Sequence, residues 1–261
     1  MRKIVIATIA ISLGLASLPA SAARCKHKAD RSAELELDGA GIVEIYALAG
    51  DLVVRGRNDL TAVQATGDAC VSKQEMLAET DITIRRTGDR IQVLAEMPDT
   101  SDEGDGQWED EYAVMDLEID LPAGVGVVVY DSSGEMKVTN LASAEITDSS
   151  GGIDIRDITG PVVIPQDSSG DIYMERVGEV TIQVDSSGEI EIRDADAVTI
   201  ANDTSGDIFV SDIRGSVLVG NDSSGKITAR GVGGDLIVEN DTSGGISYDR
   251  VVGKVSLPEQ R

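Results

Sequence analysis

Aromatic side chains are nearly absent from this sequence of 261 residues. Phe, Trp and Tyr together make up 3% of the chain, with one Phe and one Trp, although 41% of the residues are hydrophobic. A compact globular protein usually fills its centre with large rings, whereas a thin repeat structure is filled by stacked aliphatic residues. The composition therefore favours a repeat structure.

Positive charge is also scarce. The chain has 22 Lys and Arg against 47 Asp and Glu, which gives a formal net charge of -25 at pH 7. So negative a surface repels phosphate backbones and anionic lipid head groups, so we expect no nucleic acid partner and no direct adsorption to membranes. Two interpretations remain: the charge attracts cations or basic partners, or it only keeps an extended β-protein soluble.

No hydrophobic run is long enough to span a membrane comfortably. The longest one, Ile4 to Leu18, follows two basic residues and leads to the small residues Ala20-Ser21-Ala22. A basic start, an apolar run and a small-residue cleavage site are typical of a secretory signal peptide. We therefore expect residues 1–23 to be a signal peptide cleaved near Ala22 or Ala23. The mature protein would be periplasmic or secreted, with no direct membrane insertion.

Cysteine and histidine are too few for a metal or redox centre. The chain holds Cys25, Cys70 and a single histidine, His27, with no Cys-x-x-Cys spacing. Two cysteines in an exported chain most simply form one disulfide bond. The sequence therefore predicts a Cys25–Cys70 disulfide that ties the mature N-terminus to the first β-layer.

What the chain has in plenty is the tetrapeptide Asp-Ser/Thr-Ser-Gly, which occurs seven times. Its aspartates follow one another at intervals of 17, 19, 18, 18, 19 and 19 residues. They are Asp131, Asp148, Asp167, Asp185, Asp203, Asp222 and Asp241. Self-similarity at so constant a period is the signature of a solenoid, in which each repeat buries its apolar face against its neighbours.

Two pairs of apolar columns recur in every repeat. One pair follows the motif glycine, as Ile172 and Met174 do, and the other precedes the next aspartate, as Val180 and Ile182 do. Residues two apart face the same side of a strand, so each coil has two main strands, and equivalent strands pair in parallel. The sequence predicts an all-β fold, a parallel β-solenoid (β-helix) with coils of 17–19 residues over residues 125–261.

A divergent N-terminal layer, residues 24–124, precedes the regular repeats. Ala49 to Val54 matches the later Ser-Gly-Asp-Ile-x-Val pattern without the Asp and Ser residues in front, which is typical of a capping repeat. Residues 82–84 and 91–93 alternate on either side of a polar turn and predict a hairpin. Leu117 to Leu121 predicts a further strand that ends at the turn Pro122-Ala123-Gly124.

An acidic loop, residues 98–112, interrupts this layer. It contains seven acids, two glycines and the only tryptophan. Asp99, Glu103 and Asp110 stand at the first, fifth and twelfth positions of an approximate calcium-loop register. No helical pattern flanks the loop, so the alternative is an exposed connection that water solvates.

Turn chemistry explains the repeated motif. Asp at the first position of a tight turn accepts hydrogen bonds from backbone amides further on, Gly at the fourth allows a positive φ, and hydroxyls can bridge to the next coil. Seven aspartates stacked one strand spacing apart nevertheless repel one another by roughly 1 kcal/mol per neighbouring pair in water. Amide or hydroxyl donors, raised pKa values or cations between the coils must offset this repulsion. The seven motif aspartates are therefore a candidate ladder for calcium or another divalent cation.

Two further columns are candidates for contacts. Asn202, Asn221 and Asn240 fall in one column, where side-chain amides can hydrogen-bond along the rod. Tyr173 and Phe209 lie two coils apart on the outward side of the first strand, which suits contact with a glycan or a peptide. Isolated surface rings are also common, so a purely structural role is the alternative.

Catalysis is not expected from these residues. A nucleophilic serine needs a base within hydrogen-bond reach, and His27 lies outside the repeats. Paired carboxylates of the glycosidase kind could be drawn from the ladder, but the repeats are nearly interchangeable and mark no coil as special. No cofactor is required, and calcium is the one ion that the sequence suggests.

Leu121-Pro122-Ala123-Gly124 followed by repeated Ser-Gly-x-Ile-x-Val coils resembles the bacterial β-strand-repeat domains of unknown function described as putative adhesins, which are related to autotransporter adhesin heads. The resemblance covers residues 40–258. It implies a parallel β-solenoid in an envelope protein, and it transfers no catalytic residue.

The sequence thus predicts a non-enzymatic exported β-solenoid that acts as an adhesin-like binding or scaffolding module of the bacterial cell envelope. Its partner would be an envelope protein or a glycan. Two alternatives are a polysaccharide-active β-helix enzyme and an acidic rod that binds divalent cations. The last coil has no obvious cap, so end-to-end self-association through this C-terminal coil is a further hypothesis.

Overall fold

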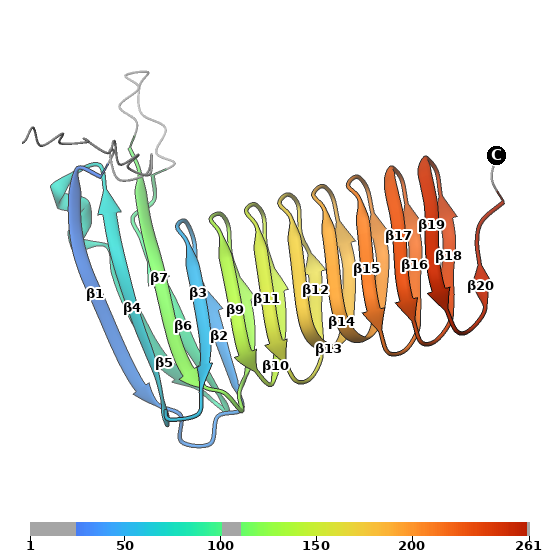
Figure 1. The fold of residues 1–261 in the computed structure, drawn as a ribbon. Helices are drawn as coiled ribbons and strands as arrows, with labels where there is room; N and C mark the ends of the chain where they lie inside the picture. The colour runs from blue at the N-terminus through green and yellow to red at the C-terminus, as the bar shows by residue number, and fades with distance from the viewer. Residues whose placement is uncertain (1–24, 101–110, 260–261) are drawn as a thin grey trace, which may run out of the picture.

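The computed structural model describes residues 25–100 and 111–259, and this part of the chain is an all-β rod of stacked coils (Figure 1). Two long β-faces run along the rod, and the chain crosses from one face to the other at the corners of each coil. The predicted parallel β-solenoid with two strands per coil is confirmed.

Each face begins at the N-terminal end of the rod. The first face consists of β1 (His27–Glu36), β4 (Ala62–Val71), β7 (Ala113–Pro122), β3 (Leu52–Arg57), β9 (Met136–Leu141), β11 (Ile153–Ile158), the first halves of β13 (Ile172–Asp185) and β14 (Ile190–Asp203), β15 (Ile208–Ile213), β17 (Gly225–Val232) and β19 (Gly244–Val251). The second face consists of β5 (Asp81–Thr87), β6 (Arg90–Glu96), β2 (Ile42–Tyr46), β8 (Gly126–Tyr130), β10 (Ser143–Thr147), β12 (Val162–Gln166), the second halves of β13 and β14, β16 (Val217–Asp222), β18 (Leu236–Asp241) and β20 (Val255–Ser256).

Equivalent residues of successive coils stand directly opposite one another. Ile172 pairs with Ile190, Ile190 with Ile208, and Ile208 with Ile227, so each step advances the chain by one sequence repeat. Because side chains alternate along a strand, every second residue of each strand faces inward. The predicted columns are buried in every coil before the last one, and each Ile or Val taken from water contributes about 1.5–3 kcal/mol.

The opening coil comes from residues far away in the sequence. Strands β2 and β3 lie directly beside β8 and β9, with Val43 opposite Val127 and Leu52 opposite Met136. The match of Ala49 to Val54 with the later repeats is confirmed, because Gly50 has the same positive φ as the motif glycines. Residues 58–125 therefore form an excursion that leaves the stack and returns to it.

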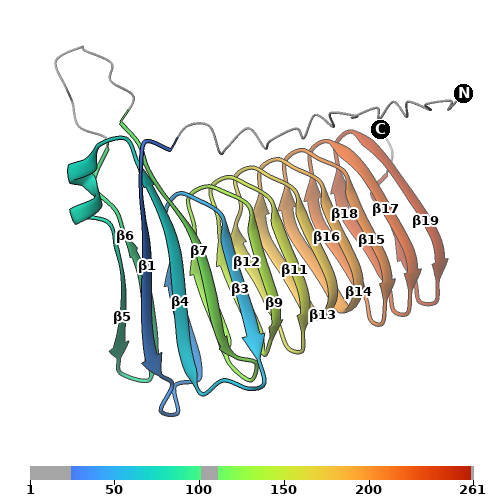
Figure 2. The same ribbon diagram turned by 60° about the vertical axis from the view of Figure 1, so that its left-hand side comes forward.

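This excursion, together with β1, builds a cap at the N-terminal end of the rod (Figure 2). Strands β6 and β7 continue the parallel stack, whereas β4, β1 and β5 run antiparallel to their neighbours. The predicted hairpin is confirmed, with Thr87 paired to Arg90 across the turn. The divergent layer is thus mixed, with parallel strands next to the coils and antiparallel strands at its outer end.

Polar and covalent bonds fasten the cap. Arg31 on β1 donates to the carbonyl oxygens of Leu77 and Thr80 at 2.7 and 2.6 Å, beside the 3-10 helix Gln74–Ala78. The predicted disulfide joins Cys25 to Cys70, with their Cα atoms 5.5 Å apart. The predicted signal peptide, residues 1–23, lies outside the described residues.

The two corners of a coil differ in which residues have a positive φ. At the motif corner the glycines have positive φ, for example +136° at Gly188. At the opposite corner the positive φ belongs to non-glycine residues in most coils, namely Asn140, Asp157, Arg176, Asp194, Asp212 and Arg250. The glycine expected at that corner, such as Gly178, lies two residues later, where an added Cβ would come 2.3 Å from the carbonyl oxygen of Gly160.

We predict that Gly188→Ala destabilises the rod strongly. The added Cβ would lie 1.8 Å from the carbonyl oxygen of Gly170, and the backbone φ of +136° is unfavourable for any L-residue. The expected loss is at least about 2 kcal/mol in the free energy of unfolding, measured by urea denaturation. Gly124→Ala is the control, because its Cβ would meet no atom within 4 Å. Equal stability of the two variants would contradict the prediction.

Candidate functional site

The repeated motif forms a tight corner whose backbone groups bond from coil to coil. The Ser186 amide donates to the Asp167 carbonyl oxygen at 3.2 Å, and the Gly188 amide donates to the carbonyl oxygen of Ser205 in the next coil, also at 3.2 Å. The Ser187 hydroxyl donates to the Ser168 carbonyl oxygen at 3.2 Å. The predicted hydroxyl bridges between coils are therefore confirmed, and they occupy the carbonyl groups of the motif.

The motif aspartates form a buried column at this corner. Asp185 pairs in register with Asp203 and with Asp167, and Asp203 with Asp222. The exposed fraction of the first six aspartates is 6% or less, whereas Asp241 in the last repeat is half-buried. Asp185 stands in the chain between Ile182 and Ile190, which belong to the two buried apolar columns.

These carboxylates lack hydrogen-bond donors. Neither oxygen of Asp131, Asp148, Asp167, Asp185, Asp203 or Asp222 has a partner, and one oxygen of Asp241 lacks one as well. The prediction that turn amides satisfy the aspartates is wrong in part. The amides of the next two residues, such as Ser168 and Ser169 after Asp167, come close enough to lower the pKa, but they do not reach hydrogen-bond geometry.

Burial raises the pKa of every aspartate in the inner column. The pKa rises to about 6 at Asp131, Asp185 and Asp222, and to about 7 at Asp167 and Asp203. Removal from water is the main cause, since it disfavours the charged form. The negative charge of the neighbouring coils adds to the effect at Asp167 and Asp203.

The sequence predicts two candidate cation sites, the aspartate ladder and the acidic loop. Among residues 25–100 and 111–259, no group of three or more His, Cys, Asp and Glu side chains is arranged to hold a metal ion. Of the acidic-loop candidates, only Asp99 belongs to the described residues, while Glu103 and Asp110 lie outside them. Calcium binding at the ladder or at the loop therefore stays a prediction.

The asparagine column behaves as predicted. The Asn240 side-chain amide donates to the Asn221 side-chain oxygen at 2.9 Å, and Asn221 donates to Asn202 at 2.9 Å. An amide can donate and accept at once, so a stacked column satisfies itself. A carboxylate can only accept hydrogen bonds, so the adjacent aspartate column cannot satisfy itself in the same way.

Tyr173 and Phe209 lie in one outward column, with Glu191 between them. Arg156 covers the Tyr173 ring at 4.7 Å, and two guanidinium groups, those of Arg193 and Arg230, cover the Phe209 ring at 5.3 and 5.6 Å. Part of each ring face is thus occupied by cation–π contacts within the protein. Contact with a glycan or a peptide stays a prediction.

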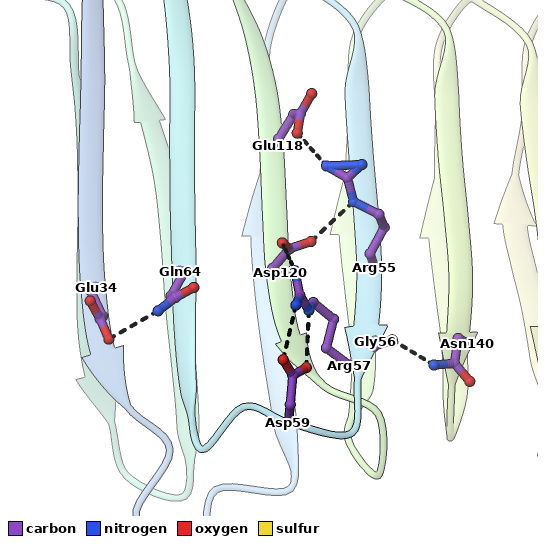
Figure 3. A network of polar contacts seen from close by, with 9 residues as sticks. All are labelled: Glu34, Arg55, Gly56, Arg57, Asp59, Gln64, Glu118, Asp120 and Asn140. Carbon is purple, nitrogen blue, oxygen red and sulfur yellow. Dashed lines mark hydrogen bonds and ion pairs between the residues drawn. The ribbon is translucent and has the colours of Figure 1, made fainter.

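Ion pairs fasten the outer surface of the first face, as Figure 3 shows near the cap. Arg55 on β3 donates to Asp120 on β7 at 3.0 Å, and Arg57 donates to the same carboxylate at 3.3 Å. Asn140 on β9 donates to the Gly56 carbonyl oxygen at 2.5 Å. The figure also draws the contacts of Glu34 with Gln64, of Arg55 with Glu118 and of Arg57 with Asp59. The bonds of Arg55 and Arg57 to Asp120 and of Asn140 to Gly56 join the cap to the first coils, while the Glu34–Gln64 bond lies within the cap.

The sequence analysis missed an exposed acidic row directly after the motif glycine. Asp51, Asp171 and Asp207 each accept a hydrogen bond from a backbone amide of the adjacent coil, at 2.8–3.0 Å. Asp116 on β7, which follows a methionine, accepts one from the Asp51 amide at 3.0 Å. The signal was present, because an acid follows the glycine at five of the eight positions that the register aligns: Asp51, Glu135, Asp171, Glu189 and Asp207. These aspartates fix the spacing of the coils at the surface.

No family model matches the chain, and no curated protein matches it. Among solved structures, it is similar to a putative adhesin from Bacteroides fragilis, with 16% identity and a TM-score of 0.49 over 86% of this chain and 98% of that chain. A putative cell adhesion protein from Clostridium sporogenes is 11% identical, with a TM-score of 0.33 over 87% and 100%. A putative lipid binding protein from Parabacteroides distasonis is 14% identical, with a TM-score of 0.40 over 87% and 96%.

We predict that Phe209→Ala lowers the free energy of unfolding by about 1 kcal/mol, because two guanidinium groups lose their ring contact. Thermal and urea denaturation measure the change. Lys137→Ala is the matched control, since Lys137 holds the equivalent outward position of an earlier coil and is exposed. An effect no larger than that of the control would show that the ring contacts do not stabilise the rod.

Proposed function

We propose that this chain is a non-enzymatic rod of the cell envelope, an adhesin-like or scaffolding module outside the cytoplasm, which joins a second copy of itself through its C-terminal coil. The observation that carries the proposal is the open outer edge of β19. Its inner edge pairs with β17 over Gly225–Val232. Within residues 25–100 and 111–259, no strand pairs with the outer edge.

Apolar side chains are exposed along this edge. The exposed fraction is 49% at Tyr248, 36% at Val255 and 81% at Val252. The equivalents of Tyr248 and Val255 in the preceding coil, Ala229 and Leu236, are fully buried. An additional β-layer would remove this surface from water, which contributes about 25 cal/mol per Å² of apolar area.

Backbone groups on the edge also lack a neighbour. The amides of Ile172 and Ile190 donate to carbonyl oxygens of the following coil, those of Glu189 and Asp207, at 2.8 and 2.9 Å. Ile246 holds the same column, so its amide faces outward along the rod. A row of unpaired amides and carbonyls is a template for pairing with another strand.

The last coil also carries little negative charge. Residues 244–257 contain one acid, Asp249, and two bases, Arg250 and Lys254. The whole chain carries a net charge of -25. Two such rods repel one another in most orientations, but their last coils meet without that repulsion.

A second copy fits the edge better than a single peptide strand does. The rod ends in two strands, β19 on one face and β20 on the other, so a full partner must present two strands at once. The last coil of a second copy does so when the copies are related by a two-fold axis. The opposite end is closed by the antiparallel, charged strand β1 and by Arg31, which does not match. We therefore expect a closed dimer and no fibre.

The location outside the cytoplasm rests on the disulfide. The bond between Cys25 and Cys70 is of the kind that persists in oxidising compartments. In the described part of the chain, no helix is long and apolar enough to cross a membrane. The signal peptide, the choice between periplasm and secretion, an envelope protein or glycan partner and the relation to autotransporter heads stay predictions.

The polysaccharide-active alternative finds less support. A shallow groove of 380 Å³ lies at the corner opposite the motif. It is lined by Asp157, Asp196, Arg176 and Arg214. Arg176 donates to Asp157 at 2.6 Å and holds the pKa of that carboxyl below its usual range. Arg214 donates to Asp196 at 2.6 Å. Carboxylates held in this way are poorly placed to act as a general acid, which needs a raised pKa.

We predict that the mature chain sediments as a dimer and that Tyr248→Lys converts it to a monomer, since two added charges would meet at the apolar edge. Sedimentation equilibrium over a wide concentration range gives the mass. Val184→Lys is the matched control, because Val184 is similarly exposed, at 38%, but lies on an inner coil.

A dimer in wild type and in the control, with a monomer in Tyr248→Lys, supports the proposal. A wild type that stays monomeric at every concentration overturns it. Assemblies that grow without limit would contradict the C-terminal pairing, because each copy contributes one such edge.

A further inference from the structure

The aspartate column requires a neutralising partner that the protein does not supply as a donor. Six carboxyl groups are at least 94% buried, by the fractions given above, and none of their oxygens has a hydrogen-bond partner. Isolated carboxylates in an apolar interior are so unfavourable that they acquire either a proton or a cation. The question for this column is which of the two it holds.

The backbone around the column leaves no spare ligands. The carbonyl oxygens of Asp167, Ser168 and Ser187 already accept hydrogen bonds from the adjacent coils. Calcium takes six to eight oxygen ligands, and a column of single carboxylates offers few per step. Within the described ranges no cluster of three acidic, His or Cys side chains fits a metal ion. This geometry favours protons over divalent cations.

The charges that act on the column are all negative. Asp131 faces Asp51 and Asp148, Asp167 faces Asp148 and Asp185, Asp185 faces Asp171, Asp203 faces Asp185 and Asp222, and Asp222 faces Asp207 and Asp241. None of these groups is a lysine or an arginine. Carboxyl groups in mutual contact lower their repulsion when one of each pair binds a proton.

We propose that the motif aspartates form a proton-sharing column, in which a protonated carboxyl of one coil donates to a carboxylate oxygen of the next. The register supplies the geometry, because successive aspartates stand directly opposite one another, about 4.8 Å apart along the rod. The protons come from solvent when the coils stack, and they return to solvent when the coils separate. No other reactant is needed.

The column makes the rod sensitive to pH in a defined direction. In the unfolded chain these aspartates have ordinary pKa values near 4, so the folded rod binds more protons than the unfolded chain between about pH 4 and pH 7. The stabilisation is fully present below the unfolded pKa and is lost as the pH rises through the folded values. The rod is therefore more stable in mildly acidic than in alkaline surroundings.

We predict that the unfolding equilibrium constant of the mature chain rises by about tenfold per pH unit for each proton released, measured by urea denaturation from about pH 5 to about pH 8. Asp185→Asn removes one titrating group from the middle of the column. It should reduce the pH slope and gain stability relative to wild type at the alkaline end.

Glu179→Gln is the matched control, because Glu179 lies on β13 together with Asp185, is exposed and stands outside the aspartate column. It removes the same charge and should leave the slope unchanged. Infrared spectroscopy of the wild type gives a second measurement that does not depend on a variant. The carbonyl band of protonated carboxylic acid should persist in the folded protein at about pH 5.5 and disappear by about pH 8.

Three results would overturn the proposal. One is stability that does not change, or that rises, with increasing pH. Another is the same slope in Asp185→Asn and in wild type. The third is stabilisation at alkaline pH by added calcium chloride that a chelator reverses, since the column would then hold cations in place of protons.

Discussion

In the regular coils of this rod, each strand residue is stacked on its counterpart in the next coil, one strand spacing away. The register sets Ile opposite Ile, Asn opposite Asn and Asp opposite Asp along the coils. What a residue contributes therefore depends on how well its side chain interacts with a copy of itself. Aliphatic side chains in one column bury one another, and each side-chain amide donates a hydrogen bond to one neighbour and accepts one from the other. Aspartate is the exception, because its charged form repels the copy above and the copy below.

The same stacking makes the two ends of the rod unequal. A coil in the middle is covered on both sides, whereas an end coil needs a different structure to cover it. At the N-terminal end the antiparallel strands, Arg31 and the disulfide supply that cover. At the last coil the side chains of Tyr248 and Val252 remain exposed. This asymmetry is the basis for the proposed pairing at the last coil.

The sequence predicted the regular half of the fold in detail, because its period exposed both strand columns and both corners. It did not predict that β2 and β3 pair with β8 and β9, since residues 58–125 separate the partners and carry no repeat. For the repulsion between the motif aspartates it offered turn donors, raised pKa values or cations. The turn backbone is engaged between coils and leaves the carboxyl oxygens unpaired, whereas the raised pKa values are confirmed. The sequence also did not predict that arginine side chains cover the rings of Tyr173 and Phe209, because those contacts cross between coils.

Because the motif corner is the same in successive coils, whole repeats can be gained or lost without breaking the stack. Neighbouring coils present the same backbone edges on both sides, from Gly170 through Gly188 to Gly206. A gene duplication or deletion of one whole repeat would join equivalent strands again and leave the cap and the last coil intact. Each such event would change the rod length by about 4.8 Å and leave the structures of its two ends unchanged.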